Sequence, residues 1–124
     1  RHLDHWVKRR QEIARKYDDL FSGNRHIVPI RRRNEEQHAY HLYVIRVKKR
    51  NSLMAYLKEK GIETLIHYPV PLHLQKAYRY LGYKRGDFPQ AEKFAQEILS
   101  LPIYPEIHEQ DINYIAQSVR EFYV

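Results

Sequence analysis

The stretch from Gly61 to Gln75 constrains the fold most strongly, because it carries an apolar segment directly into a loop that prolines hold extended. Pro69 and Pro71 fix the backbone angle φ and donate no amide hydrogen, so neither can lie in a central strand. The segment 63–68 before them, with Leu65 and Ile66 at its centre, predicts a strand. The chain must therefore leave the sheet here, and a rigid loop leaving a strand can hold polar side chains against a ligand.

Polar side chains are concentrated at this strand end and in the loop. His67 and Tyr68 end the predicted strand, and His73 and Gln75 follow the two prolines. His67, Tyr68 and His73 are therefore candidate binding residues. The alternative is that Tyr68 and the prolines only pack, and that both histidines are solvated or hydrogen-bonded to backbone.

Length and charge limit the possibilities without choosing a function. A chain of 124 residues, 43% of them hydrophobic, is expected to form one folded domain with a small core. The net charge of 22 − 15 = +7 favours anionic partners, such as nucleic acid or phosphorylated small molecules. The absence of cysteine excludes thiolate catalysis and disulfides. No apolar run approaches the roughly 20 residues of a membrane span, and we expect a cytoplasmic protein.

Hydrophobic periodicity predicts a small α/β domain of two layers, with a short mixed or antiparallel sheet covered by helices. Strand 40–47 is apolar on both faces, so it is expected to be central and covered on both sides. The charged face of helix 1–22, which includes Arg9 and Arg10, is expected to face solvent. Residues 31–37 form a polar connector. The other predicted elements are a strand at 27–30, helices at 52–60, 74–81, 89–98 and 108–123, and an extended edge segment at 99–105.

Two topologies remain open for the strands at 40–47 and 63–68, which the helix at 52–60 joins. If the two strands are neighbours, the unit is a crossover and the strands run parallel. A sheet with another strand between them fits the sequence equally well.

A search for catalytic motifs finds no complete set. The four glycines match neither a phosphate-binding loop nor a dinucleotide fingerprint. Two histidine pairs, His2 with His5 and His38 with His41, lack a third ligand at a metal-site spacing. The serines, including Ser100, do not lie in a nucleophile-elbow sequence.

An ordered series of motifs covers nearly the whole chain, and its central motif is His67-Tyr-Pro-Val-Pro-Leu-His-Leu-Gln75. Its segments are Arg9–Tyr17, Tyr40–Arg46, Gly61–Gln75, Ala77–Tyr78, Leu81–Tyr83, Gly86–Pro89, Ala91–Glu92 and Ile98–Glu106. This series resembles the C-terminal third of the sugar aminotransferases of the DegT/DnrJ/EryC1/StrS family. A long ordered series of this kind is more specific than any single motif.

The resemblance implies a pyridoxal-phosphate enzyme of fold type I, usually a homodimer. Such enzymes move an amino group, usually from glutamate, onto a keto sugar of a nucleotide-sugar in amino-sugar and polysaccharide biosynthesis. The family's cofactor lysine lies in a larger upstream domain, which has no counterpart here. Residues 1–124 therefore resemble the small C-terminal domain, expected to be inert and to bind no pyridoxal phosphate by itself. The missing initiator methionine also indicates a fragment or a processed chain.

Carried over residue by residue, the resemblance places His67 and Tyr68 against the sugar and His73 near the diphosphate. Pro69 and Pro71 would shape the loop. Two other functions stay open: a freestanding regulatory or oligomerisation module without catalysis, and a basic module that binds nucleic acid. The second is disfavoured, because the positive charges are spread over every predicted helix and do not form one stripe.

Overall fold

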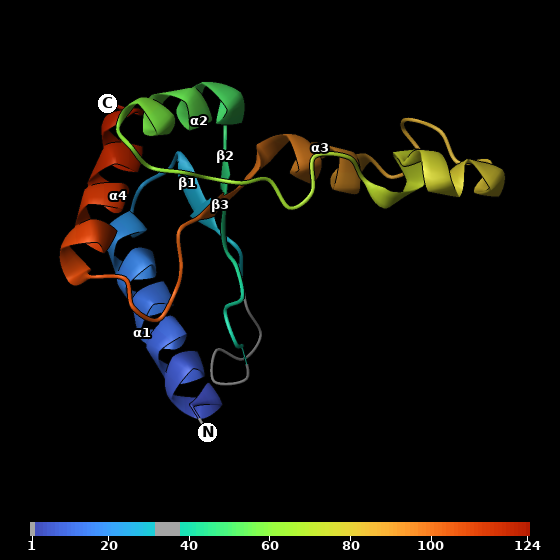
Figure 1. Cartoon of the computed structure of the whole chain (residues 1–124). Helices are drawn as coiled ribbons and strands as arrows, with labels where there is room; N and C mark the ends of the chain where they lie inside the picture. The colour runs from blue at the N-terminus through green and yellow to red at the C-terminus, as the bar shows by residue number, and fades with distance from the viewer. Residues whose placement is uncertain (1, 32–37) are drawn as a thin grey trace.

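The protein forms a three-stranded antiparallel sheet with helices on both sides, in a computed structural model that describes residues 2–31 and 38–124 (Figure 1). The strands are β1 (Ile27–Pro29), β2 (Tyr43–Val47) and β3 (Ile98–Leu101), in the order β1-β2-β3. This arrangement confirms the predicted small α/β domain and the central position of β2. The predicted connector at 31–37 lies, except for Arg31, outside the described residues.

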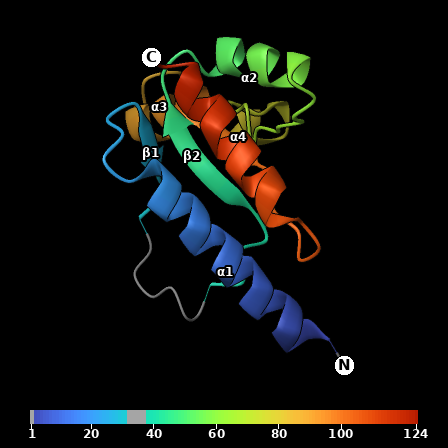
Figure 2. The same ribbon diagram turned by 90° about the vertical axis from the view of Figure 1, so that its left-hand side faces the viewer.

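In the described part of the chain, four α-helices surround the sheet. They are α1 (Leu3–Phe21), α2 (Arg50–Glu59), α3 (Pro89–Glu97) and α4 (Glu109–Glu121), and two short 3-10 helices, η2 (Leu72–Leu74) and η3 (Lys76–Leu81), precede α3. Figure 2 shows α1 and α4 in front of the strands and α3 behind them. None of the helices in residues 2–31 and 38–124 is both long and apolar enough to cross a membrane.

The core lies between one face of the sheet and the helices α1 and α4. The cross-strand partners Ile45 and Leu99 are fully buried there, together with Tyr17 of α1 and Val119 of α4. The Tyr17 hydroxyl donates a hydrogen bond of 3.0 Å to the carbonyl oxygen of Pro102, so this buried polar group is satisfied. Alternate residues of each strand point into this core, which explains the apolar alternation of β2.

The opposite face of the sheet is only partly covered. Val28 is exposed there, and its cross-strand partner Arg46 is half-buried. The Arg46 guanidinium pairs with Glu97 of α3 at 2.7 Å and lies 4.2 Å from the ring centre of Phe94. The prediction that strand 40–47 is covered on both sides is thus confirmed for the core face of β2 and only in part for the other face, where Val44 and Arg46 are half-buried and α3 reaches one end.

The predicted strand at 63–68 is reduced to a single antiparallel bridge between Leu65 and Ser100. Because Ser100 belongs to β3, that strand lies between β2 and the segment around Leu65. The second of the two open topologies is thus the one observed. The two antiparallel pairings make the Leu65 segment run parallel to β2 without touching it. The chain then leaves the sheet just before Pro69 and Pro71, which cannot donate to a ladder.

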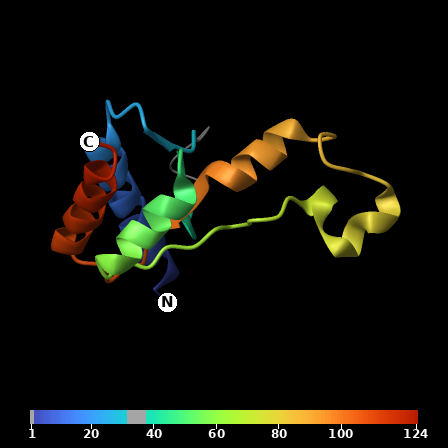
Figure 3. The same ribbon diagram turned by 90° about the horizontal axis from the view of Figure 1, so that it is seen from above.

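Residues 68–97, which we call the arm, project from the rest of the chain. Figure 3 shows the arm extending away from α1, α2 and α4, with η2 and η3 towards its far end. The helix predicted at 74–81 is two short 3-10 turns, and large side chains such as Leu72 and Tyr80 are exposed. The pattern of the predicted helix 89–98 places Ala91, Phe94, Ala95 and Ile98 on its buried face, but only Ala95 is buried. Exposed apolar side chains that gather in this way usually lie against another surface. No other segment of residues 2–31 and 38–124 covers those of the arm.

We expect Ile45→Ala to lower the free energy of unfolding of the chain by about 2–5 kcal/mol, because it removes fully buried methyl groups and leaves a cavity. Val28→Ala, on the open face, is the matched control and should change it by less than about 0.5 kcal/mol. Urea titration followed by circular dichroism measures both. Equal effects of the two substitutions would contradict the assignment of core and open face.

Candidate functional site

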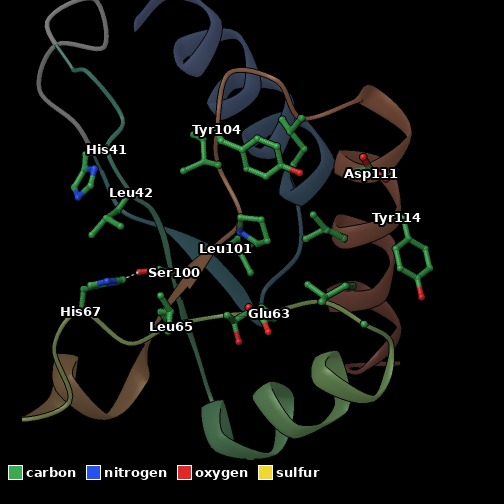
Figure 4. A pocket seen from close by; sticks show the side chains of 17 residues that line it. His41, Leu42, Glu63, Leu65, His67, Ser100, Leu101, Tyr104, Asp111 and Tyr114 are labelled. Carbon is green, nitrogen blue, oxygen red and sulfur yellow. Dashed lines mark hydrogen bonds between the residues drawn. The ribbon is translucent and has the colours of Figure 1, made fainter. Parts of the chain in front are cut away.

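A cleft of about 690 Å³ opens beside the outer edge of β3. Its walls come from residues 61–65, the segment 100–104 and α4, and His67 lies at one end (Figure 4). Polar groups around it include Glu63, Tyr104 and Asp111. A hollow of this size that mixes apolar walls with a few polar groups is the usual form of a small-molecule site.

His67 is held at this cleft by Ser100. The Nδ1 atom of its ring lies 2.9 Å from the hydroxyl oxygen of Ser100, which is itself buried (Figure 4). The backbone of Ser100 also exchanges two hydrogen bonds with Leu65, at 2.8 Å and 3.2 Å. The candidate histidine is therefore anchored to the sheet, and its other ring nitrogen, Nε2, is left for a further partner.

Tyr68 is adjacent to His67 in sequence but lines a different hollow. The two rings meet edge to face with centres 5.5 Å apart, and Tyr68 is 69% exposed. It borders an apolar cavity of about 570 Å³ inside the arm, together with Leu72, Phe88 and Phe94. The structure thus brings the two rings into contact without directing both of them into the cleft.

His73 has a structural partner within the arm. Its side chain is only 8% exposed, and its Nε2 atom lies 3.1 Å from a carboxylate oxygen of Glu92 in α3. The same oxygen accepts a hydrogen bond of 2.7 Å from the amide of Gly86. His73 is therefore neither solvated nor bonded to backbone, and it joins η2 to α3. It also borders the arm cavity, so its predicted contact with a diphosphate stays a prediction.

Ser100 is the residue that the motif search missed. The search tested serines only as nucleophiles, and Ser100 lies outside the nucleophile-elbow pattern. A signal was present in the sequence, since Ser100 is a single hydroxyl between Leu99 and Leu101 in an apolar strand. Serine has little intrinsic preference for strands, so its presence there points to a specific hydrogen bond.

The prediction that the charged face of α1 meets only solvent is wrong for Arg9 and Arg10. Both side chains donate hydrogen bonds to backbone carbonyl oxygens of other segments. Arg10 donates to the carbonyl oxygens of Tyr40 and Ile103, at 3.0 Å and 2.9 Å. Arg9 donates to the carbonyl oxygens of Pro105 and Ile107, both at 3.3 Å. Helix α1 thus anchors the segment that follows β3. That segment, and not α1, forms one wall of the cleft. The aliphatic stems of arginines suit this partly buried position.

The lysines of this chain do not fit the role of a cofactor-binding lysine. That role needs a lysine whose pKa is lowered by burial or by neighbouring cations. Every lysine here is at least partly exposed, and none lines the cleft or the arm cavity. Hydrogen bonds to Tyr56 and to Glu121 raise the pKa of Lys60 above its ordinary value, which keeps that amine protonated. The chain therefore holds no candidate for a Schiff base.

A model of the DegT/DnrJ/EryC1/StrS aminotransferase family matches residues 1–120. This chain belongs to that family. It is 43% identical to the "Pleiotropic regulatory protein" of Geobacillus stearothermophilus over 125 residues, which cover 98% of this chain and 33% of that protein. It is 37% identical to the dTDP-3-amino-3,4,6-trideoxy-alpha-D-glucose transaminase of Streptomyces venezuelae, with 98% of this chain and 32% of the relative covered.

A solved structure shares the fold over almost the whole chain. The crystal structure of S. venezuelae DesV in complex with a ketimine intermediate superposes with a TM-score of 0.92 at 36% identity. The match covers 98% of this chain and 33% of that one. The chain thus spans about a third of the length of its relatives, as the resemblance to their C-terminal domain implies.

The link between His73 and Glu92 predicts a shifted titration in the arm. The Gly86 amide, and then His73, hold the pKa of the Glu92 carboxyl below its ordinary value of about 4.3, against the opposing effect of burial. The stability that the carboxylate contributes is therefore fully present above that value and is lost as the pH falls through the lower folded pKa. Carbon NMR of the Glu92 carboxyl should show a midpoint below about 4.3.

His73→Leu should move this Glu92 midpoint only part of the way back, because the Gly86 amide still donates to the carboxylate. A midpoint already at the ordinary glutamate value in the unsubstituted chain would contradict the arrangement around Glu92. A full return in the variant would make His73 the larger cause of the shift, in place of Gly86.

Proposed function

We propose that residues 1–124 are the C-terminal domain of a pyridoxal-phosphate-dependent aminotransferase that moves an amino group from glutamate onto a keto sugar of a nucleotide-sugar. The observation that carries this proposal is the match of the whole fold to DesV, a protein solved with a ketimine intermediate. A ketimine is an imine between an amino group and a keto carbon, as expected when an amine is transferred to a ketone. The larger remainder of the protein would hold the cofactor.

His67 is the residue of this chain that we place against the substrate. Its ring lies at the cleft, and its Nε2 atom can donate to or accept from a sugar hydroxyl, a keto oxygen or a phosphate oxygen. Tyr68 and His73 stay secondary proposals, because both border the arm cavity. The cleft would then be one wall of an active site whose cofactor side belongs to the upstream domain.

The exposed apolar arm supports a larger assembly. Tyr68, Leu72 and Tyr80 are each more than half exposed, an arrangement that costs solubility unless another surface covers it. Under this proposal the upstream domain or the second subunit of a homodimer covers the arm.

A second function has one observation in its favour. The relative that is 43% identical is named a regulatory protein, which agrees with a module retained for regulation or oligomerisation. The two functions separate in one assay, in which the full-length protein is incubated with pyridoxal phosphate, glutamate and a nucleotide-linked keto sugar. Amino-sugar formation supports the enzyme, and its absence with a folded, cofactor-free protein supports the regulatory module.

We expect the 124-residue chain to form no stable adduct with pyridoxal phosphate, because every lysine is at least partly exposed and none lines the cleft or the arm cavity. Mass spectrometry after borohydride reduction measures this, and the full-length protein treated identically is the positive control. Stoichiometric trapping at one lysine of the short chain would contradict the assignment of the cofactor to the upstream domain.

In the full-length protein, His67→Ala should lower kcat/KM for the keto sugar roughly ten- to hundredfold, the cost of losing a buried hydrogen bond of about 1–3 kcal/mol. The absorbance of the bound cofactor should stay unchanged. His108→Ala is the matched control, since His108 is exposed at the start of α4 and makes no side-chain cap bond. Equal kinetics for the two variants would remove His67 from the site.

A further inference from the structure

Ser100 is a buried serine whose side chain lies on the face of β3 opposite to that of its neighbours, as alternation along a strand requires. Leu99 and Leu101 point into the core and are almost fully buried. Ser100 is 5% exposed as well, although its side chain does not belong to the core cluster. A buried hydroxyl without a partner costs free energy, so its hydrogen bond explains why a serine is present at this position.

Sheet geometry aims this hydroxyl at His67. Leu65 and Ser100 are directly opposite in an antiparallel bridge, so their side chains lie on the same face of the sheet. His67 lies two residues beyond Leu65, in a bend that follows the bridge, and its ring reaches back to the Ser100 side chain. The resulting contact between Nδ1 and the hydroxyl oxygen is 2.9 Å.

The chemistry of a hydroxyl suits this position. A serine hydroxyl can donate to Nδ1 or accept from it, so the pair can persist in either tautomer of the ring. In both cases Nδ1 is occupied and Nε2 remains the nitrogen that can meet a ligand. An alanine at 100 would leave the backbone bridge to Leu65 in place while freeing the ring to rotate about its side-chain torsions.

We propose that Ser100 is a positioning residue, which holds the His67 ring so that Nε2 is presented to the nucleotide-sugar in the cleft. This inference rests on the proposed function, because it assigns the second residue of the same site. It separates Ser100 from the nucleophile role for which serines in enzymes are usually considered. The backbone bridge between Leu65 and Ser100 contributes to the same role, because it brings the Ser100 and His67 side chains within hydrogen-bonding distance.

A double-mutant cycle in the full-length protein tests the proposal. We expect Ser100→Ala to lower kcat/KM for the keto sugar about three- to tenfold, the effect of losing one neutral hydrogen bond. Ser100→Thr, which keeps the hydroxyl and suits a strand, should restore most of the activity. Because Ser100 acts through His67, adding Ser100→Ala to His67→Ala should cause no further loss. Ser118→Ala, another buried serine, on α4, is the matched control and should behave as the unsubstituted protein.

A second readout does not depend on activity. Nitrogen NMR of the His67 ring in the 124-residue chain should show an Nδ1 signal that moves in Ser100→Ala and keeps its position in Ser118→Ala. Equal losses from Ser100→Ala with and without His67 would show a general structural role and overturn the proposal, as would an unchanged ring signal. If the unsubstituted full-length protein aminates no nucleotide-linked sugar, the proposed function fails, and the role of Ser100 in that site fails with it. A normal enzyme in which Ser100→Ala is silent overturns only the inference about Ser100.

Discussion

The antiparallel register between β2 and β3 is the interaction on which the rest of this structure depends. It places Leu99 against Ile45 and Leu101 against Tyr43, which builds the core under α1 and α4. Because side chains alternate along a strand, the same register turns Ser100 to the other face, where it meets Leu65 and His67. A slip of one residue would bury the serine hydroxyl in the core and expose both leucines. Core and candidate site are thus products of one pairing.

The arm leaves many apolar side chains of this chain exposed. Its residues form two short 3-10 helices and α3, which line an open apolar hollow and leave tyrosines and leucines exposed. Ionic and polar contacts such as that between His73 and Glu92 hold the arm together internally. The chain matches about a third of the length of each of these relatives. The other two thirds of those proteins are long enough to cover such a surface. The arm and the cleft meet at His67 and Tyr68, where the chain changes from sheet to loop.

Several predictions from the sequence failed for one physical reason. A local sequence pattern does not show which residues a side chain contacts in the folded chain. The pattern of helix α1 places Arg9 and Arg10 on its charged face, but that face meets the carbonyl oxygens of residues 103–107. The segment 63–68 predicts a strand, but it forms only the bridge at Leu65 before the prolines carry the chain out of the sheet. Likewise, Tyr68 and His67 are adjacent in sequence and face different hollows.

The sequence by itself determined the small α/β class, the central strand at 43–47, most of the helices and the family, because periodicity and an ordered series of motifs are local properties that survive without knowledge of contacts. It also singled out His67, from residue type and from the prolines that follow. Only the tertiary structure decided that β3 lies between β2 and Leu65, that Ser100 holds His67, and that His73 is bound to Glu92. These contacts join residues 19 to 58 positions apart, and such pairs are chosen by sheet register and packing, which no local pattern specifies.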